Sequence, residues 1–357
     1  MHQTNDRFST GSRTEVVIAS QKAPSTSVYV TSSEKARQNF RQNPCSRWHQ
    51  KDAAPDQADG TLAFQRLRQP LFTPVITPGF TLQRTDKLFA IGSCFARAIE
   101  KALIGRKMEV LSVAPEFDSF ETINKQVTGR GFTNKYNTFA IYNELRWALD
   151  PATECPRESI VDLGDGRFCD PHITPTLPLA NSEETWRRRS LVELVNRRIA
   201  QCRVVIITLG LAEVWRDTIT DTFINATPVP ELSRQYPDRY EFHVSDFARN
   251  FANLEAIHAL LERFGHPDVQ FVVTVSPVPL MATFSTEDVV LANTYSKSLL
   301  RTVAQEWAAA HDNVHYFPSY EIVQNSDRAT TWEEDLRHVR AKVANHIMDL
   351  FLDTYLS

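Results

Sequence analysis

The sequence predicts an α/β protein built on an open parallel sheet with helices on both faces, which makes three layers. From Asp86 to the C-terminus, short and almost wholly apolar runs alternate with longer stretches at helical spacing. Strands that are apolar on both faces are typical of parallel sheets that helices cover on both sides. The two strongest runs, RVVIITL at residues 203–209 and VQFVVTV at residues 269–275, have this character.

The other elements follow from the same two patterns. An apolar run that ends at Gly92 predicts a buried strand, and Phe95, Ile99 and Leu103 then recur on one helix face. Strands are expected at residues 87–91, 108–113, 203–209, 269–275 and 314–317, and helices at 95–103, 137–149, 182–200, 291–310 and 338–356, the second of which Asn137 can cap.

The chain divides into a leader and a domain. Residues 1–84 are rich in Ser, Thr, Gln, Arg and Pro, and only 25–32 and 64–67 suggest a short strand and a short helix. We expect a polar, partly disordered N-terminal leader there, followed by a folded α/β domain at 85–357. Within that domain, residues 217–247 interrupt the alternation with hairpin-like polar and aromatic residues, and we expect a lid or hairpin insertion.

Composition narrows the class of protein. Hydrophobic residues make up 42% of the chain, and the net charge of −4 does not suggest nucleic acid or a membrane surface as a partner. The five cysteines have no regular spacing, which argues against a disulfide framework and a structural zinc site. Neither a signal peptide nor a membrane span of ~18 apolar residues is recognisable. We therefore expect a soluble, cytoplasmic protein without membrane insertion.

The residues directly after the first strand carry the first chemical signal. Ser93 and Cys94 lie where a strand turns into a helix, and backbone amides at a helix N-terminus stabilise a thiolate, an alkoxide or an oxyanion. Either side chain can therefore be a nucleophile. The alternative is that Cys94 is a small core residue and Ser93 a plain helix cap.

A second signal lies before the last helix. The spacing of Asp335 and His338 lets a carboxylate orient an imidazole, which can then act as a general base. Gly210 and Ser276 also follow predicted strands. Because the carboxyl ends of parallel strands meet at one edge of a sheet, we expect these segments to converge there.

Several motifs together resemble the GSCFA-domain proteins. IGSCFA at residues 91–96 is the signature of that family, and DLRH at 335–338 is its last block. The resemblance extends over roughly residues 85–355 and includes NKYNT at 134–138, TLGL at 208–211, EVW at 213–215, TVSPV at 274–278, Ser296 with Lys297, Leu300 with Arg301, and YFPSYE at 316–321.

That family in turn is similar to the SGNH, or GDSL-type, hydrolases. The resemblance implies a flavodoxin-like sheet, with Cys94 at the nucleophile position and Asp335 and His338 as its partners. Gly210 matches the next block, but Ala212 stands at the position of the oxyanion-hole asparagine and Glu213 at that of the aspartate. Asn134 and Asn137, after the second strand, are candidates for the missing amide.

The resulting hypothesis is an acyl-ester hydrolase or O-acyltransferase with a covalent intermediate on Cys94 or Ser93. A thioester donor such as acyl-CoA suits a cysteine, no other cofactor is expected, and the substrate is a small molecule or a glycan. Lys297 and Arg301 could meet the donor's phosphates, although a solvated helix face explains them better. The alternative function is a catalytically inactive ligand-binding module. A metal hydrolase is disfavoured because no H-E-x-x-H motif or cluster of metal ligands is present.

Overall fold

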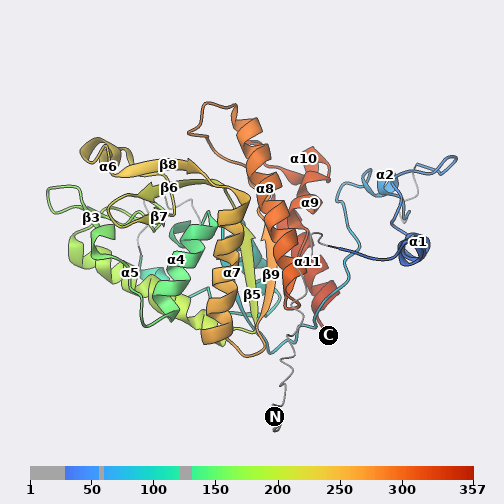
Figure 1. Cartoon of the computed structure of the whole chain (residues 1–357), viewed down its shortest axis with the longest axis horizontal. Helices are drawn as coiled ribbons and strands as arrows, with labels where there is room; N and C mark the ends of the chain where they lie inside the picture. Colours follow the sequence, from blue (N-terminus) through green and yellow to red (C-terminus); the bar gives the residue numbers. More distant parts are fainter. Residues whose placement is uncertain (1–28, 56–59, 121–130) are drawn as a thin grey trace, which may run out of the picture.

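The computed structural model describes residues 29–55, 60–120 and 131–357, and at its centre lies a five-stranded sheet (Figure 1). Its strands are β1 (Lys87–Gly92), β2 (Glu109–Val110), β5 (Val204–Leu209), β9 (Gln270–Val275) and β10 (Val314–Tyr316). All neighbours pair in parallel, in the order β2-β1-β5-β9-β10. Counted along the chain this is 2-1-3-4-5, the flavodoxin-like order, whose topological switch point lies between β1 and β5.

Helices cover both faces of this sheet, which confirms the predicted three-layer α/β fold. Leu88 and Ala90 of β1 enter one core, whereas Phe89 and Ile91 enter the other, because successive side chains of a strand point to opposite faces. The first core is shared with α3 (Cys94–Gly105), α9 (Ser319–Gln324) and α11 (Ala341–Tyr355), and the second with α4 (Thr138–Leu149), α7 (Phe247–Phe264) and α8 (Val289–Ala310).

Some elements differ from the sequence prediction. The predicted second strand shrinks to two residues, the helix after residue 182 divides into α5 (Ser182–Asn196) and the 3-10 turn η4 (Arg197–Gln201), and α7 was not predicted. The last helix begins at Ala341 instead of residue 338. The cause is a tight turn in which the His338 amide donates to the Asp335 carboxylate, while Leu336 has a φ of 52°.

Residues 213–244 form a second, smaller sheet. Its three antiparallel strands are β6 (Glu213–Asp217), β7 (Thr222–Ile224) and β8 (Tyr240–Val244), with α6 (Pro230–Gln235) before β8. A buried ion pair between Arg239 and Asp217 closes its far end. The expected hairpin insertion at 217–247 overlaps this sheet over residues 217–244, and its role as a lid stays a prediction.

The leader predicted at residues 1–84 is not separate from the domain at its C-terminal end. Leu82 is fully buried in the core and forms a parallel bridge with Leu356, and Asp327 donates its amide to the Pro70 carbonyl. The predicted helix at 64–67 is present as α2 (Ala63–Arg66); residues 29–32 of the predicted strand are not extended in a sheet, and 25–28 lie outside the described residues. An unpredicted helix, α1 (Ser33–Gln42), buries no side chain and lies beside the layers in Figure 1.

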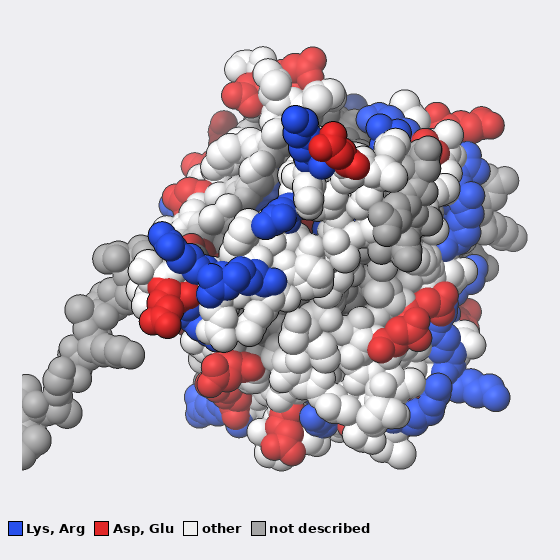
Figure 2. Space-filling view, turned by 90° about the vertical axis from the view of Figure 1, so that its right-hand side faces the viewer, with Lys and Arg blue, Asp and Glu red and all other residues white. Residues whose placement is uncertain are grey.

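Short elements complete the described fold. They are η1 (Pro115–Ser119), η2 (Gly131–Thr133), η3 (Arg157–Ser159), the hairpin of β3 (Val161–Asp162) and β4 (Phe168–Cys169), and α10 (Arg328–Thr331). None of the described helices has the length and apolar character that crossing a membrane requires. On the face shown in Figure 2, basic and acidic side chains are interspersed around a broad area that carries neither, so this face has no extended region of one charge.

Candidate active site

The turn after β1 is built by Gly92 and Ser93. Gly92 has a φ of 135°, and a Cβ there would lie 2.2 Å from the Thr208 carbonyl oxygen, so only glycine fits. Ser93 is buried and caps α3, since its Oγ accepts from the Phe95 amide at 3.3 Å. Its amide and its Oγ also contact Thr208 on β5. The turn thus links the ends of β1 and β5 at the switch point. The Ser93 side chain contributes to this link through its contact with Thr208.

Cys94 is the first residue of α3 and is half-buried. Burial raises the pKa of its thiol, whereas Arg337, Lys297 and the backbone amides of Cys94 and Phe95 act in the opposite direction. The sulfur therefore lies at a helix N-terminus with two cations near it. Such surroundings favour a thiolate during a reaction, although the resting thiol keeps its proton.

The segment from Asn134 to Tyr136 lies across the carboxyl ends of β1 and β5. The Lys135 amide donates to the Gly92 carbonyl at 2.7 Å, and the Leu211 amide donates to the Tyr136 carbonyl at the same distance. A Cβ on Gly210 would lie 2.5 Å from the Tyr136 carbonyl oxygen, so glycine allows this close approach. Gly210 therefore shapes the site through its backbone.

The two candidate amide side chains have different surroundings. Asn137 caps α4 by accepting from the Ala140 amide, and its Nδ2 donates to the carbonyls of Ile224 and Asn225. Asn134 is also buried, but its Nδ2 has only a long contact of 3.4 Å, to the Tyr136 hydroxyl, and its Oδ1 has no hydrogen-bond partner among the described residues. Of the two, Asn134 is the one with an amide left to offer a ligand.

Asp335 and His338 form a close pair on the turn before α11. The Asp335 carboxylate lies 2.5 Å from His338 Nδ1 and accepts the His338 amide at 2.9 Å. The amides of His338 and Arg337 hold the pKa of Asp335 well below its usual range. The side chain of His338 is 54% exposed, and its Nε2 lies 3.2 Å from Arg337 Nη1. Because arginine only donates, Nε2 is the acceptor and Nδ1 carries the proton in this arrangement.

Arg337 connects this pair to the turn after β1. Its charge acts on Cys94, Tyr136 and Lys297, while its Nη1 contacts His338. Three of the four segments predicted to converge therefore lie near one another: backbone contacts with the segment of Asn134 hold the turns of Cys94 and Gly210 together, and Arg337 connects the Asp335–His338 turn to them. The fourth segment starts at Ser276, whose amide donates to the Leu209 carbonyl at the end of β5. Sequence reasoning gave no role to Arg337, although it lies inside the quoted DLRH motif.

Two further predicted residues are less clearly part of the site. Both carboxylate oxygens of Glu213 hold the loop before α8, where they accept from the Thr283 hydroxyl at 2.5 Å and the Phe284 amide at 3.2 Å. Ser276 follows β9 and is buried, and its Oγ has no hydrogen-bond partner among the described residues. Glu213 is therefore occupied by the protein itself, whereas Ser276 keeps an unused polar group.

Lys297 is buried and not on a solvated helix face as the sequence suggested. Only 1% of it is exposed, and its Nζ donates to the Gly210 carbonyl at 2.8 Å. Burial lowers its pKa to about 7. Arg301, one turn further along α8, lies near the surface and pairs with Glu321 at 2.6 Å. The spacing of four residues placed both on one helix side, but only the fold shows that Lys297 points into the site.

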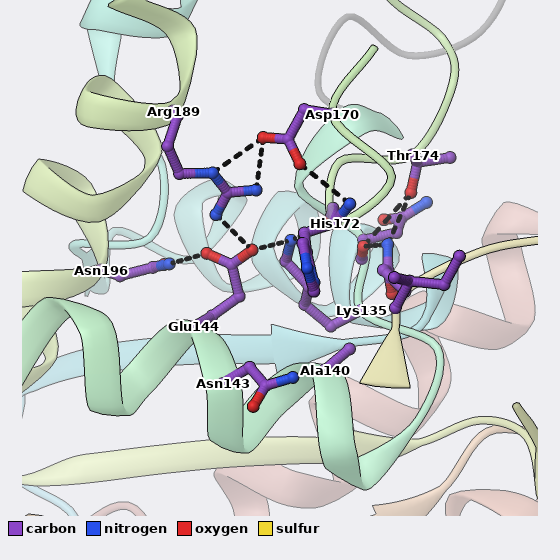
Figure 3. Close-up of polar contacts among 12 residues, drawn as sticks. Lys135, Ala140, Asn143, Glu144, Asp170, His172, Thr174, Arg189 and Asn196 are labelled. Atoms are coloured by element: carbon purple, nitrogen blue, oxygen red, sulfur yellow. Dashed lines mark hydrogen bonds and ion pairs between the residues drawn. The ribbon is translucent and has the colours of Figure 1, made fainter. Parts of the chain in front are cut away.

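A buried network of charges supports the segment that spans the strand ends (Figure 3). Lys135 and Arg189 both contact Glu144, at 2.6 and 2.7 Å, and Arg189 also binds Asp170. Arg189 is fully buried, so the sequence RRR at residues 187–189 is not wholly a solvated face. His172 is buried as well, with both ring nitrogens unpartnered among the described residues, and burial lowers its pKa well below the usual value.

The comparisons with known proteins bear on this arrangement. The family model of the GSCFA family matches residues 87–351, which is most of the chain. The chain belongs to the GSCFA family. In this GSCFA protein the matched region starts at β1 and includes every candidate site residue, from Ser93 to His338. A search of curated proteins gives no match.

Proposed function

We propose that this GSCFA protein hydrolyses or transfers an ester-linked acyl group through a covalent acyl-enzyme on Cys94. The observation that carries the proposal is the position of Cys94. It is a half-buried thiol on the first residue of α3, at the switch point of the sheet, with the charges of Arg337 and Lys297 acting on it. A thiol in such surroundings is suited to nucleophilic attack.

The internal variant, attack by Ser93, has less support. Ser93 is buried, and its Oγ is engaged by the Phe95 amide and the Thr208 hydroxyl. Moving it to a substrate would remove the cap of α3. We therefore assign the nucleophile to Cys94. A cysteine also favours a thioester donor such as acyl-CoA, because moving an acyl group from one thiol to another changes the free energy little.

Asp335 and His338 supply acid–base catalysis in this proposal. Asp335 fixes the imidazole with the proton on Nδ1, which leaves Nε2 as the base once Arg337 releases it. The Cys94 amide and Asn134 Nδ2 are the proposed oxyanion donors. With water as acceptor the protein is an esterase, and with a hydroxyl of a glycan or small molecule it is an O-acyltransferase. The similarity to SGNH hydrolases supports these roles.

Two observations favour the second candidate, a binding module without catalysis. Arg337 Nη1 contacts His338 Nε2, the nitrogen that must act as base, and Ala212, at the position of the oxyanion-hole asparagine, has no amide side chain to offer. A module of this kind would bind an acylated ligand at the same rim. It would not form a covalent intermediate, so the two candidates differ in a directly measurable product.

The test is intact-mass spectrometry after incubation with p-nitrophenyl acetate and, separately, acetyl-CoA. We expect one acetyl adduct in wild type and in Ser93→Ala, none in Cys94→Ala, and slow release of the adduct in His338→Ala. Cys45→Ala is the matched control, because Cys45 is the other half-buried cysteine among the described residues. An adduct that persists in Cys94→Ala would contradict the assignment, and a lack of any adduct in wild type would favour the binding module.

A further inference from the structure

Lys297 is buried without a carboxylate partner among the described residues. It lies on α8, is 1% exposed, and its Nζ donates a hydrogen bond to the Gly210 carbonyl at 2.8 Å. A second lysine that is fully buried among the described residues, Lys135, pairs with Glu144 at 2.6 Å. Burying an ammonium without a counter-charge costs folding free energy, so such a group is rare unless it has a function.

The surroundings of Lys297 link it to the nucleophile. Gly210, which holds its Nζ, packs directly on Ser93, since a Cβ on that glycine would lie 3.4 Å from the Ser93 Cβ. The charged or titratable groups that face the thiol are Lys297 from α8, Arg337 from the turn before α11, and Tyr136 from the segment across the strand ends. Lys297 itself is faced by Cys94 and Arg337.

We propose that Lys297 is the proton acceptor for the Cys94 thiol. The inference rests on the proposed function and deepens it. Arg337 cannot take this proton because a guanidinium stays protonated in proteins. His338 is half-exposed, and its Nε2 is occupied by Arg337. Lys297 is left as the nearby group that can lose and regain a proton at neutral pH.

The acylation step balances as follows. The Sγ–H bond of Cys94 breaks, and its proton joins the lone pair of Lys297 Nζ. The Sγ–C bond to the acyl carbon forms, and the bond from that carbon to the leaving oxygen or sulfur breaks. The leaving group takes the proton from the Lys297 ammonium, which returns to the neutral amine. The Asp335–His338 pair then serves the acceptor, water or a hydroxyl, in the second half of the reaction.

This division gives the Cys94 thiol a two-step pH profile. One step follows the pKa of Lys297, which burial lowers to about 7, and the second follows the thiol itself, whose pKa burial raises. At pH values below the first step Lys297 is protonated and cannot accept the proton of the Cys94 thiol. Between the steps, the pair shares one proton and a small fraction is present as thiolate and ammonium. A rate that depends on the thiolate should therefore rise near pH 7, level off, and rise again above pH 9.

The experiment measures alkylation of Cys94 by iodoacetamide between pH 5.5 and 10, so it needs no acyl substrate and is independent of the proposed function. Trypsin cleaves after Lys87 and Arg97, and the peptide of residues 88–97 contains Cys94 as its one cysteine. We expect both steps in wild type. In Lys297→Met and Lys297→Gln the first step should disappear, and the rate at pH 7.5 should fall at least tenfold. Gln keeps a donor for the Gly210 carbonyl without a titrating charge.

The controls separate charge from folding. Arg301→Gln lies on the same side of α8 but pairs with Glu321, so it should keep both steps. Peptides with the buried Cys155, Cys169 and Cys202 should stay unmodified in every folded variant. If either variant keeps the step near pH 7, or if wild type shows only the rise above pH 9, the inference is wrong, whereas an acyl adduct on Cys94 would still uphold the proposed function. Wild type alone can overturn it, even if both variants misfold.

Discussion

At the scale of single residues, Ser93 and Cys94 share one turn and have separate tasks. Ser93 caps α3 from a buried position, and losing an N-cap costs about 0.5–2 kcal/mol of stability. We expect Ser93→Ala to lower the free energy of unfolding in urea by about 1 kcal/mol while the acyl adduct on Cys94 still forms. Ser32→Ala is the control: it removes the cap of α1, which buries no side chain, and should leave the transition unchanged. A stable Ser93→Ala protein without adduct would instead move the nucleophile to Ser93.

Lys297 carries a stability cost that depends on pH. The unfolded chain keeps this lysine protonated up to about pH 10.4, whereas the folded chain releases the proton near pH 7. Between these values the unfolded state binds more protons, so wild-type stability rises with pH because of this group. Below pH 7 the buried ammonium is present and its cost is complete.

Lys297→Met should therefore be more stable than wild type, by about 1–3 kcal/mol near pH 6, since replacing a buried charge by an apolar side chain of similar size is often stabilising. The advantage should shrink as the pH rises from 7 to 9. Urea denaturation at pH 6, 7, 8 and 9 measures it, with Arg301→Met as the surface control. A Lys297→Met protein that is less stable at every pH would contradict the cost assigned to this lysine.

At the scale of elements, the segment Asn134–Tyr136 depends on a network that lies behind it. Lys135 reaches from this segment to Glu144 on α4 and to the His172 carbonyl, and Arg189 of α5 completes the network. Burial opposes ionisation of Glu144, but Arg189 and Lys135 outweigh it and lower its pKa to about 2. The Glu144 carboxylate thus pairs with two buried cations, of which Arg189 also pairs with Asp170.

Glu144→Gln should be strongly destabilising, because breaking a buried ion pair by removing one partner costs about 3–5 kcal/mol. Glu184→Gln is the matched control on α5: Glu184 pairs with Arg187 and Arg188 near the surface, where such a loss costs about 0–1 kcal/mol. Urea midpoints of the two variants give the comparison. Equal midpoints would mean that the buried network does not hold the segment in place.

The same elements show what could be predicted from the sequence. The strand after residue 203 is buried at every position, is apolar except at Thr208, and was predicted almost to its ends, because burial on both faces leaves a nearly continuous apolar run. Helix α7 was missed, since Asn250 and His258 lie on its buried face and interrupt the apolar stripe. The predicted helix start at residue 338 was wrong because a local carboxylate–amide turn outcompetes helix formation there.

Some residues of the candidate site could be predicted from the sequence and others could not. Residues directly after a strand, such as Cys94 and Gly210, could be predicted because parallel strands end at one edge of the sheet. Lys297 and Arg189 could not, since each lies in a charged or mixed helical stretch that looks solvated until the neighbouring elements are in place. Asn137 shows the reverse case. It caps α4, as the sequence also predicted, so its side chain is engaged there and is not available to the site.

At the scale of the whole molecule, the parallel sheet explains why distant segments form one site. At the switch point between β1 and β5 the strand order reverses, and Lys297 of α8 and Arg337 of the turn before α11 both act on Cys94 there. A contact outside this sheet bears on where the domain begins. Leu82 forms a bridge with Leu356, directly after α11. A residue that precedes the first strand therefore packs on the helix that follows the Asp335–His338 turn.

Leu82→Ala tests this boundary. The side chain is fully buried among the core residues of α3 and α11, and removing a buried leucine costs about 2–5 kcal/mol. Val75 lies in the same stretch but is 72% exposed, so Val75→Ala should change stability by less than about 0.5 kcal/mol. Urea denaturation of both variants decides between two descriptions of the chain. A large loss for Leu82 alone places the start of the folded unit before residue 82, whereas similar small losses would return residues 1–84 to a leader that the domain does not need.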